Sequence, residues 1–264
     1  MAASSRFLRT SGVHATIEPD RWREGAWVLS IDGAEQSHVN LAAPEDVFYE
    51  YLRRIANVVD LAAPAGEPIR ALHLGAGALT LARYIQATRP GSVQHAVELE
   101  RELLDFVLAQ LPLPEGSVLA THIGDAREAL AGFNGGPGFD VIILDIFSGP
   151  EAPEHIACED FYREAAALLA DDGVLLVNVG DEPGFTLVRS QTAALRRVLD
   201  GVAAYGESSL FSGRYPGNII LAGVQRPWPA AWSTQLTARG PHPATVLAGV
   251  DLDQLADPPQ GRRP

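Results

Sequence analysis

The sequence has 264 residues, of which 47% are hydrophobic and 20% charged, and this composition is typical of a globular protein with one main core. Its formal net charge of −13 argues against nucleic acid and anionic membranes as partners, because both would repel the chain. Cys158 is the only cysteine, which excludes an internal disulfide and a cysteine metal cluster.

The opening residues, MAASSRFLRTSG, lack the apolar core of a signal peptide. No apolar run in the sequence approaches the ~18 residues that a membrane-spanning helix needs. We therefore expect a cytoplasmic protein.

The first sixty residues are expected to form β-hairpins followed by one helix. The segments VHATIEPD (13–20) and WVLSIDGAEQSHVNL (27–41) alternate partly between apolar and polar residues, the second around the turn Asp32-Gly33. Pro44, Glu45 and Asp46 then predict a helix start, because proline fits the first turn and acids favour its positive end.

From residue 70 onward, strand and helix patterns alternate. The predicted strands are 71–74, 93–98, 118–123, 141–144 and 174–179, with 203–210 and 218–224 as a closing pair. The predicted helices are 79–87, 101–111, 126–131, 159–169 and 185–199. This alternation predicts an α/β fold with a mostly parallel sheet covered by helices on both faces.

After residue 226 the chain is rich in proline and alanine, and we expect a partly ordered tail with one short helix, 251–256. The expected division is therefore a hairpin region with its linking helix (1–60), an α/β domain (61–226) and a Pro-rich tail (227–264).

Polar residues and glycines stand at the carboxyl ends of successive predicted strands, where ligands bind in such sheets. The first strand ends in Gly75-Ala76-Gly77, and Glu98 follows Gly77 by 21 residues, about the spacing at which an acid binds ribose hydroxyls. Asp125 and Asp145 end the third and fourth strands. Together they indicate one nucleoside-binding crevice.

The glycine loop lacks the third glycine of a dinucleotide site and the Lys-Ser/Thr pair of a phosphate loop. An adenosine with a neutral or cationic arm suits the surrounding acids better than a phosphate. This favours S-adenosylmethionine, its decarboxylated form or methylthioadenosine as ligand.

Several of these residues also have a purely structural interpretation. Asp125 could cap the following helix, and Glu98 alone could be a surface acid. His73 could be a hydrogen-bonded core histidine or could touch the arm of the ligand. The histidines show no helical i, i+4 pairing, so we expect no metal site.

The residues from Trp27 to Val224 resemble the spermidine synthase (polyamine aminopropyltransferase) family, especially its divergent actinobacterial-type members. The resemblance is carried by IDGAEQS (31–37), the glycine loop with VELE (97–100), IGDAREAL (123–130), and DVIILD (140–145) with the GPEAP that follows. It implies a Rossmann-like class I S-adenosylmethionine-dependent transferase fold with a mostly parallel seven-stranded sheet and a small N-terminal β-hairpin domain. It also implies a homodimer or homotetramer.

The family's reaction transfers an aminopropyl group from decarboxylated S-adenosylmethionine to an amine. By resemblance, Gln36 would contact the thioether or ribose, Glu98 the ribose hydroxyls, and Asp125 with Ala126 the adenine. Asp145 would accept a proton from the attacking amine, which must be deprotonated before it can act as a nucleophile. The remaining predicted nucleoside contacts are His73, Gly75 and Gly77.

The sequence departs from the family on the acceptor side. Ala78 stands where the glycine loop usually carries an aspartate that binds the ammonium of the aminopropyl arm. Ser148 replaces a second aspartate three residues after Asp145. Phe48 matches the tyrosine of a family motif, with Tyr49 beside it, and His155 is a candidate gate or acceptor-site residue.

These observations leave three functions open. The first is an aminopropyltransferase-like enzyme whose acceptor is a small amine other than putrescine, or another nucleophile. The second is a methyltransferase that uses intact S-adenosylmethionine, and the third is a nucleoside-binding homologue without catalytic activity.

Overall fold

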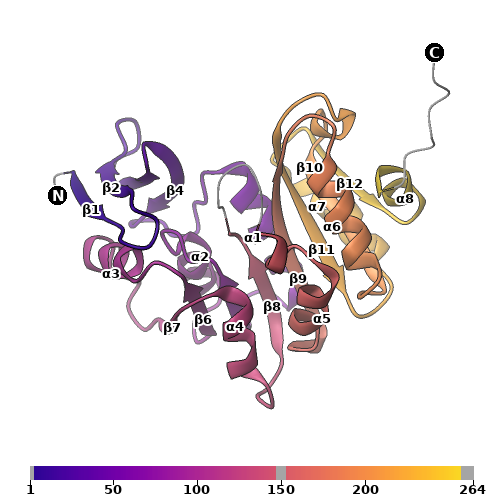
Figure 1. Cartoon of the computed structure of the whole chain (residues 1–264), viewed down its shortest axis with the longest axis horizontal. Helices are drawn as coiled ribbons and strands as arrows, with labels where there is room; N and C mark the ends of the chain where they lie inside the picture. Colours follow the sequence, from indigo (N-terminus) through magenta and orange to yellow (C-terminus); the bar gives the residue numbers. More distant parts are fainter. Residues whose placement is uncertain (1–2, 147–152, 257–264) are drawn as a thin grey trace.

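The computed structural model describes residues 3–146 and 153–256, whose strands form two sheets (Figure 1). The smaller sheet is antiparallel, with its strands in chain order: β1 (Ser4–Phe7), β2 (His14–Pro19), β3 (Ala26–Ile31) and β4 (Ala34–Asn40). The two expected hairpin segments thus contain β2, β3 and β4. The sequence did not predict β1, because its four residues are mostly polar and exposed.

Helix α1 (Glu50–Ala62) connects the two sheets and begins later than the expected position at Pro44. Residues 43–46 instead form a turn, in which the Asp46 N–H donates to the carbonyl of Ala43 at 2.9 Å. Tyr49 is extended (φ −71°, ψ 127°), so the chain enters the helix only at Glu50. The acidic and proline signals therefore marked this turn and not the helix start.

The larger sheet has eight strands among the described residues, in the order β12-β10-β11-β9-β8-β5-β6-β7. Neighbouring strands are parallel from β7 to β9, and the pairings of β11 with β9 and β10, and of β12 with β10, are antiparallel. The strands are β5 (Arg70–Leu74), β6 (Val93–Glu98), β7 (Val118–Ile123), β8 (Phe139–Leu144), β9 (Leu169–Asp181), β10 (Gly201–Glu207), β11 (Gly217–Val224) and β12 (Ala244–Ala248).

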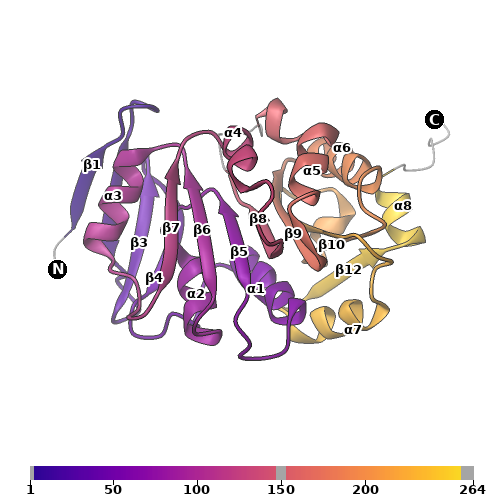
Figure 2. The ribbon, with the colours of Figure 1, turned by 90° about the horizontal axis from the view of Figure 1, so that it is seen from below.

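Helices cover both faces of this sheet, as Figure 2 shows from below. Alternate residues of each central strand serve the two faces: Leu175 and Val177 pack in one hydrophobic cluster, while Val174 and Leu176 pack in the other. The first cluster includes α4 (Ala126–Leu130), α5 (Glu159–Ala166), α6 (Thr186–Arg196) and α8 (Val250–Ala256); the second includes α1, α2 (Thr80–Thr88) and α7 (Ala230–Arg239).

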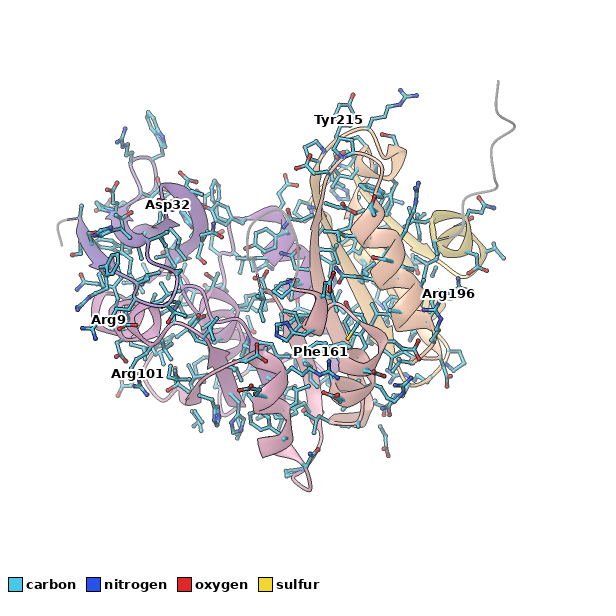
Figure 3. The ribbon with its side chains drawn as sticks, viewed as in Figure 1. Arg9, Asp32, Arg101, Phe161, Arg196 and Tyr215 are labelled. Atoms are coloured by element: carbon cyan, nitrogen blue, oxygen red, sulfur yellow. The ribbon has the colours of Figure 1, made fainter. Side chains whose placement is uncertain are left out.

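The smaller sheet packs on α3 (Arg101–Gln110) and on the start of α2, and shares a third hydrophobic cluster with them. Figure 3 illustrates the contrast between interior and surface: Phe161 is fully buried in the middle of the molecule, whereas Tyr215 protrudes from the β10–β11 connection. Three short 3-10 helices, η1 (Ala131–Phe133), η2 (Glu154–Ile156) and η3 (Leu210–Ser212), complete the described elements.

The predicted helix 159–169 is too long. Helix α5 ends at Ala166, and the Asp171-Asp172-Gly173 segment lies within β9, where the pairing with β8 shifts register. Gly173 suits this irregularity, because a Cβ there would lie 2.6 Å from the carbonyl oxygen of Phe139.

The region expected to be a partly ordered tail contains three regular elements. Helix α7 packs on α1, and β12 adds an eighth strand at the edge of the larger sheet, where the sequence predicted seven strands. The boundary at residue 226 therefore does not separate the tail from the α/β domain. Proline composition concealed this, because the prolines in the described part of this region, Pro227, Pro229, Pro241 and Pro243, lie in the connections before α7 and before β12.

Buried polar groups hold this C-terminal region in place. The Asn57 side chain donates to the carbonyl of Gly240 at 2.7 Å and to the Tyr205 hydroxyl at 3.3 Å. Arg54 donates to the carbonyl of Pro241 at 3.1 Å. Because Asn57 and Arg54 belong to α1, the connection from α7 to β12 is fixed to the helix that also leads into the functional site.

We predict that Asn57→Ala destabilises the fold by about 1–3 kcal/mol, because it leaves the buried Gly240 carbonyl without one of its donors. Urea unfolding of the full chain measures this loss. Asn134→Ala, in the exposed turn after η1, is the matched control and should change stability by less than about 0.5 kcal/mol. If Asn57→Ala and Asn134→Ala were equally stable, the hydrogen bond from Asn57 to the C-terminal region would not contribute to the stability of the fold.

Candidate functional site

A cavity of about 1070 Å³ lies beyond the carboxyl ends of β5, β6 and β8 and extends to β9, β10 and β11. Its walls also come from β4, the start of α1 and the loop between β1 and β2. Backbone hydrogen bonds continue past the strand ends: the N–H groups of Gly75, Gly124 and Asp145 donate to Val97, Glu98 and Leu74 at 2.9–3.0 Å. The polar ends of successive strands therefore meet at one edge of the sheet, as the sequence predicted.

The glycine loop lets two parts of the chain approach closely. Gly75 has φ +92°, and a Cβ there would lie 2.3 Å from the carbonyl oxygen of Asp145. Gly77 has φ +48°, and a Cβ there would lie 2.9 Å from the hydroxyl oxygen of Ser37. The same hydroxyl accepts a hydrogen bond from the Ala78 N–H at 3.2 Å, which ties the smaller sheet to the loop.

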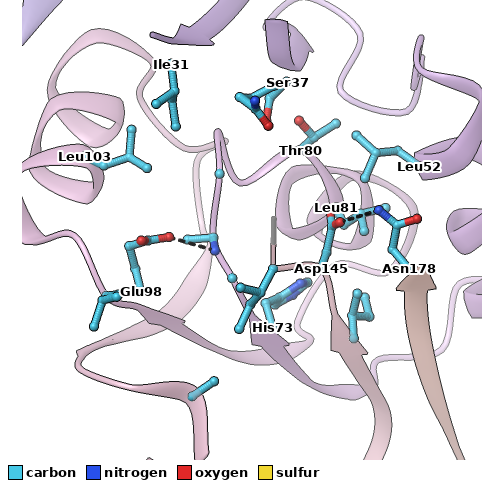
Figure 4. A pocket seen from close by; sticks show the side chains of 18 of the residues that line it. Ile31, Ser37, Leu52, His73, Thr80, Leu81, Glu98, Leu103, Asp145 and Asn178 are labelled. Atoms are coloured by element: carbon cyan, nitrogen blue, oxygen red, sulfur yellow. Dashed lines mark hydrogen bonds between the residues drawn. The ribbon is translucent and has the colours of Figure 1, made fainter. Parts of the chain in front are cut away.

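Glu98 is 9% exposed and forms one wall of the cavity (Figure 4). Its Oε2 accepts from the Ala76 N–H at 3.1 Å, and its Oε1 accepts from the Glu100 N–H at 3.0 Å. Burial raises the pKa of the Glu98 carboxyl, although these backbone donors act in the opposite direction. A buried carboxylate with lone pairs left over can accept hydroxyl hydrogen bonds from a ligand.

Glu100 was not predicted, yet it builds part of the same wall. Its carboxylate accepts hydrogen bonds from the backbone N–H groups of Thr10 and Ser11, in the connection between β1 and β2. All three residues line the cavity. No local sequence pattern indicates this contact, because it joins residues about ninety positions apart.

Asp125 caps helix α4, as its structural interpretation anticipated, and also faces the cavity. Its Oδ1 accepts from the backbone N–H groups of Arg127 and Glu128, while its Oδ2 lies 2.8 Å from His155 Nε2. Burial acts to raise the pKa of Asp125, but the His155 contact and the two backbone donors outweigh it, so the pKa lies below its usual value. Ala126 lines the cavity beside it.

Asp145 lies on the cavity floor, directly after β8. Burial raises the pKa of its carboxyl to about 6, and a hydrogen bond from the Asn178 side chain opposes that rise. The Asn178 Nδ2 donates to Asp145 Oδ1 at 2.8 Å (Figure 4). The Asn178 Oδ1 in turn accepts from the side chain of Asn218 at 3.1 Å.

His73 corresponds to the core interpretation of the sequence. Its Nε2 lies 3.0 Å from the side-chain oxygen of Gln94, and burial lowers its pKa to about 4, so the ring is neutral at pH 7. The residue also lines the cavity, as does Gln36 from β4.

The part of the cavity near α1 and β10 is rich in charged and phenolic groups. Tyr49 donates to Glu35 at 2.9 Å, and burial together with Glu35 raises the pKa of that phenol. Burial and the nearby Asp145 raise the pKa of Tyr51. The charged residues that line this part are Glu35, Glu50, Arg54 and Glu207, with Arg54 donating to Glu50 at 3.1 Å.

The described residues contain no group of three or more His, Cys, Asp or Glu side chains that could hold a metal ion. Within the same residues, no helix combines the length and apolar character needed to cross a membrane.

Comparison with known proteins relates this architecture to one family. No family model matches the sequence. A polyamine aminopropyltransferase of Chromobacterium violaceum is 26% identical over 144 residues, which are 54% of this chain and 53% of that protein. The crystal structure of a probable spermidine synthase from Corynebacterium glutamicum superposes with a TM-score of 0.88 at 27% identity, over 100% of this chain and 96% of the other. The chain is spermidine synthase-like.

The chain thus matches about half the length of its curated aminopropyltransferase relative, whereas the structural match to the Corynebacterium protein spans all of it. A more distant structure, human methyltransferase-like protein 13 in complex with SAH, is 19% identical with a TM-score of 0.57 over 81% of this chain and 94% of the other, and shows a shared fold only. The fold of this spermidine synthase-like protein is the Rossmann-like class I S-adenosylmethionine-dependent transferase fold that the sequence predicted.

The structure corrects one predicted acceptor-side residue and leaves another untested. Phe48 does not line the cavity: it is 46% exposed, with its ring 4.7 Å from that of His38 and 4.3 Å from the Arg23 guanidinium. Tyr49 and Tyr51 reach the cavity instead, because α1 starts at Glu50. Ser148 lies outside the described residues.

We predict that Gly75→Ala costs about 1–3 kcal/mol more in folding stability than Gly66→Ala. Both positions have positive φ, so both variants are destabilised by an alanine in the left-handed region. Only at position 75 would the added Cβ also clash with the Asp145 carbonyl, because nothing lies within 4 Å of a Cβ at position 66. Urea unfolding compares the two variants. Equal losses would show that the backbone approach between Gly75 and Asp145 does not constrain the site.

Proposed function

We propose that this spermidine synthase-like protein is a transferase that binds decarboxylated S-adenosylmethionine or S-adenosylmethionine and transfers an aminopropyl or other alkyl group to an amine. The main support for this proposal is the environment of Asp145. Its carboxyl has a pKa of about 6 and lies on the floor of a cavity whose far wall contains Glu98. The name of the Chromobacterium relative supports the same reaction class.

In this proposal the wall formed by Glu98 and Asp125 holds the nucleoside. Glu98 accepts the ribose hydroxyls, because its carboxylate retains lone pairs beyond the two used by backbone donors. Asp125, fixed by His155 and two backbone N–H groups, accepts from the adenine amino group. Gln36 contacts the thioether or ribose, and the glycine loop allows close approach of the ligand.

The proposed chemistry is a nucleophilic substitution at the carbon next to the sulfonium. The lone pair of the amine nitrogen forms the new C–N bond while the C–S bond breaks, and the electron pair of the C–S bond passes to sulfur, which leaves as a neutral thioether. The nitrogen loses a proton to Asp145. Burial favours this step, because a carboxyl with a pKa of about 6 is a stronger base than an exposed aspartate and is still mostly ionised at pH 7.

The acceptor is proposed to be a cationic amine other than putrescine. Putrescine-binding members of the family use two aspartates, which are replaced here by Ala78 and Ser148, and Ala78 is buried away from the cavity. Among the described residues, three other carboxylates, Glu35, Glu50 and Glu207, line the part of the cavity near α1 and β10 together with the guanidinium of Arg54, so the charge there still favours a cation.

A methyltransferase is the second candidate function. The glycine loop has no aspartate at position 78, and such an aspartate would repel the carboxylate of intact S-adenosylmethionine. Methyltransferase-like protein 13, which has the same fold, is in complex with SAH. The aminopropyltransferase and methyltransferase candidates therefore differ first in the donor molecule, which is decarboxylated S-adenosylmethionine for the former and intact S-adenosylmethionine for the latter.

Calorimetry with S-adenosylmethionine, its decarboxylated form and methylthioadenosine separates the candidates. We expect the decarboxylated form and methylthioadenosine to bind, and Glu98→Gln to weaken both by about tenfold or more, because the amide cannot accept both ribose hydroxyls. Preference for intact S-adenosylmethionine would instead favour methyl transfer. If none of the three nucleosides binds, the proposed transferase function is wrong.

With a panel of mono-, di- and polyamines as acceptors, Asp145→Asn should lower turnover by about 10²–10⁴-fold and leave nucleoside affinity within a few-fold. In the unmodified protein, kcat/KM should rise with pH through about 6, because only the ionised Asp145 accepts the proton. Wild-type turnover by Asp145→Asn would remove Asp145 from the mechanism, whichever donor binds.

A further inference from the structure

Two asparagine side chains from neighbouring antiparallel strands lead to Asp145. Asn178 lies in β9 and Asn218 at the start of β11, and both line the cavity. The Asn218 Nδ2 donates to Asn178 Oδ1 at 3.1 Å, and the Asn178 Nδ2 donates to Asp145 Oδ1 at 2.8 Å. The three side chains form a chain of hydrogen bonds that runs in one direction.

The direction follows from the chemistry of the amide group. A primary amide donates only through nitrogen and accepts only through oxygen. Because Asn218 donates to the Asn178 oxygen, the Asn178 nitrogen must face Asp145, where the carboxylate can only accept when it is ionised. In this arrangement both hydrogen bonds of Asn178 are made with its nitrogen toward Asp145, the orientation that supports a charged carboxylate.

The hydrogen bond also orients the carboxylate. Asp145 Oδ1 is engaged by Asn178, and no described residue donates to Oδ2. The backbone N–H of Asp145 donates to Leu74 at 2.9 Å, so the residue is held at both ends. The second oxygen is the one left for a ligand in the cavity.

We propose that Asn178 and Asn218 are positioning residues that keep Asp145 ionised and present its Oδ2 to the acceptor amine. Their role as positioning residues for catalysis rests on the proposed transferase function. Their effect on the protonation of Asp145 does not, because the hydrogen bonds exist in the unliganded protein.

Other titratable and charged groups around Asp145 do not take over this role. The charge of Asp145 helps to raise the pKa of Tyr51 of α1, and His73 of β5 is neutral at pH 7. The charged residues that line the cavity from α1 and β10 are Glu50, Arg54 and Glu207, and none of them forms an ion pair with Asp145. Asn178 is thus the donor that opposes the effect of burial on the pKa of this carboxyl.

Two variants test the two members separately. Asn178→Leu removes the donor at similar volume. Asn218→Leu removes the donor to Asn178 Oδ1 at similar volume and adds no charge, so a shift in the Asp145 pKa would come from the hydrogen-bond chain. Asn134→Leu, in the exposed turn after η1, makes the same exchange away from the cavity and is the matched control.

The pKa of Asp145 is read directly from the unliganded full chain by ¹³C NMR of labelled aspartate carboxyls. The Asp145 signal is assigned by its loss in Asp145→Asn. We expect an upward shift of about one pH unit or more in Asn178→Leu, since one charge-assisted hydrogen bond contributes about 1.5–3 kcal/mol. Asn218→Leu, which leaves that bond in place, should give a smaller upward shift, and the control should give none. The acid limb of the pH–rate profile should move by the same amount.

An unchanged Asp145 pKa in both Asn178→Leu and Asn218→Leu would overturn the proposal. If Asn178→Leu does not fold, as judged by its thermal transition, Asn218→Leu alone decides, because Asn218 is only half-buried and the exchange keeps a similar side-chain volume. A shifted pKa without turnover of any amine would leave the hydrogen-bond chain intact and refute the transferase function. Turnover of an amine with an unshifted Asp145 pKa would support the transferase function and refute the role proposed for the hydrogen-bond chain.

Discussion

The close approach of two backbones at Gly75 and Asp145 is the constraint on which the site depends. The missing side chain at position 75 lets the end of β8 lie against the turn that follows β5. Asp145 therefore lies directly beside the glycine loop. Because Gly77 makes a similar approach to Ser37, the same short loop also sets the position of the smaller sheet.

Three cavity carboxylates are kept in three different electrostatic environments. Glu98 is buried and held by backbone N–H groups, Asp125 is paired with His155, and Asp145 has a single amide donor. The pKa of Asp125 is consequently lowered while those of Glu98 and Asp145 are raised. A carboxylate that stays ionised to lower pH than usual thus lies at one end of the cavity, and a group that can exchange a proton near neutral pH lies on its floor.

Much of this arrangement could be predicted from local patterns. The carboxyl ends of parallel strands share one edge, so apolar runs that end in Glu98, Asp125 and Asp145 were sufficient to place these acids together. Asn178 and Asn218 could not be found in this way, because their contact depends on the antiparallel register of β9 and β11. Strand β12 escaped prediction for a related reason, since its partner β10 lies some forty residues earlier and the intervening prolines indicated a loop.

The contact between Glu100 and the β1–β2 connection closes one side of the cavity. That wall is supplied by residues 10 and 11, which are separated from Glu100 by most of the smaller sheet and the whole of α1 and α2. The central strands β5 and β6 therefore do not enclose the cavity by themselves, because the smaller sheet must be docked for this wall to exist. A fusion partner attached ahead of β1 would be joined one short strand away from the cavity rim.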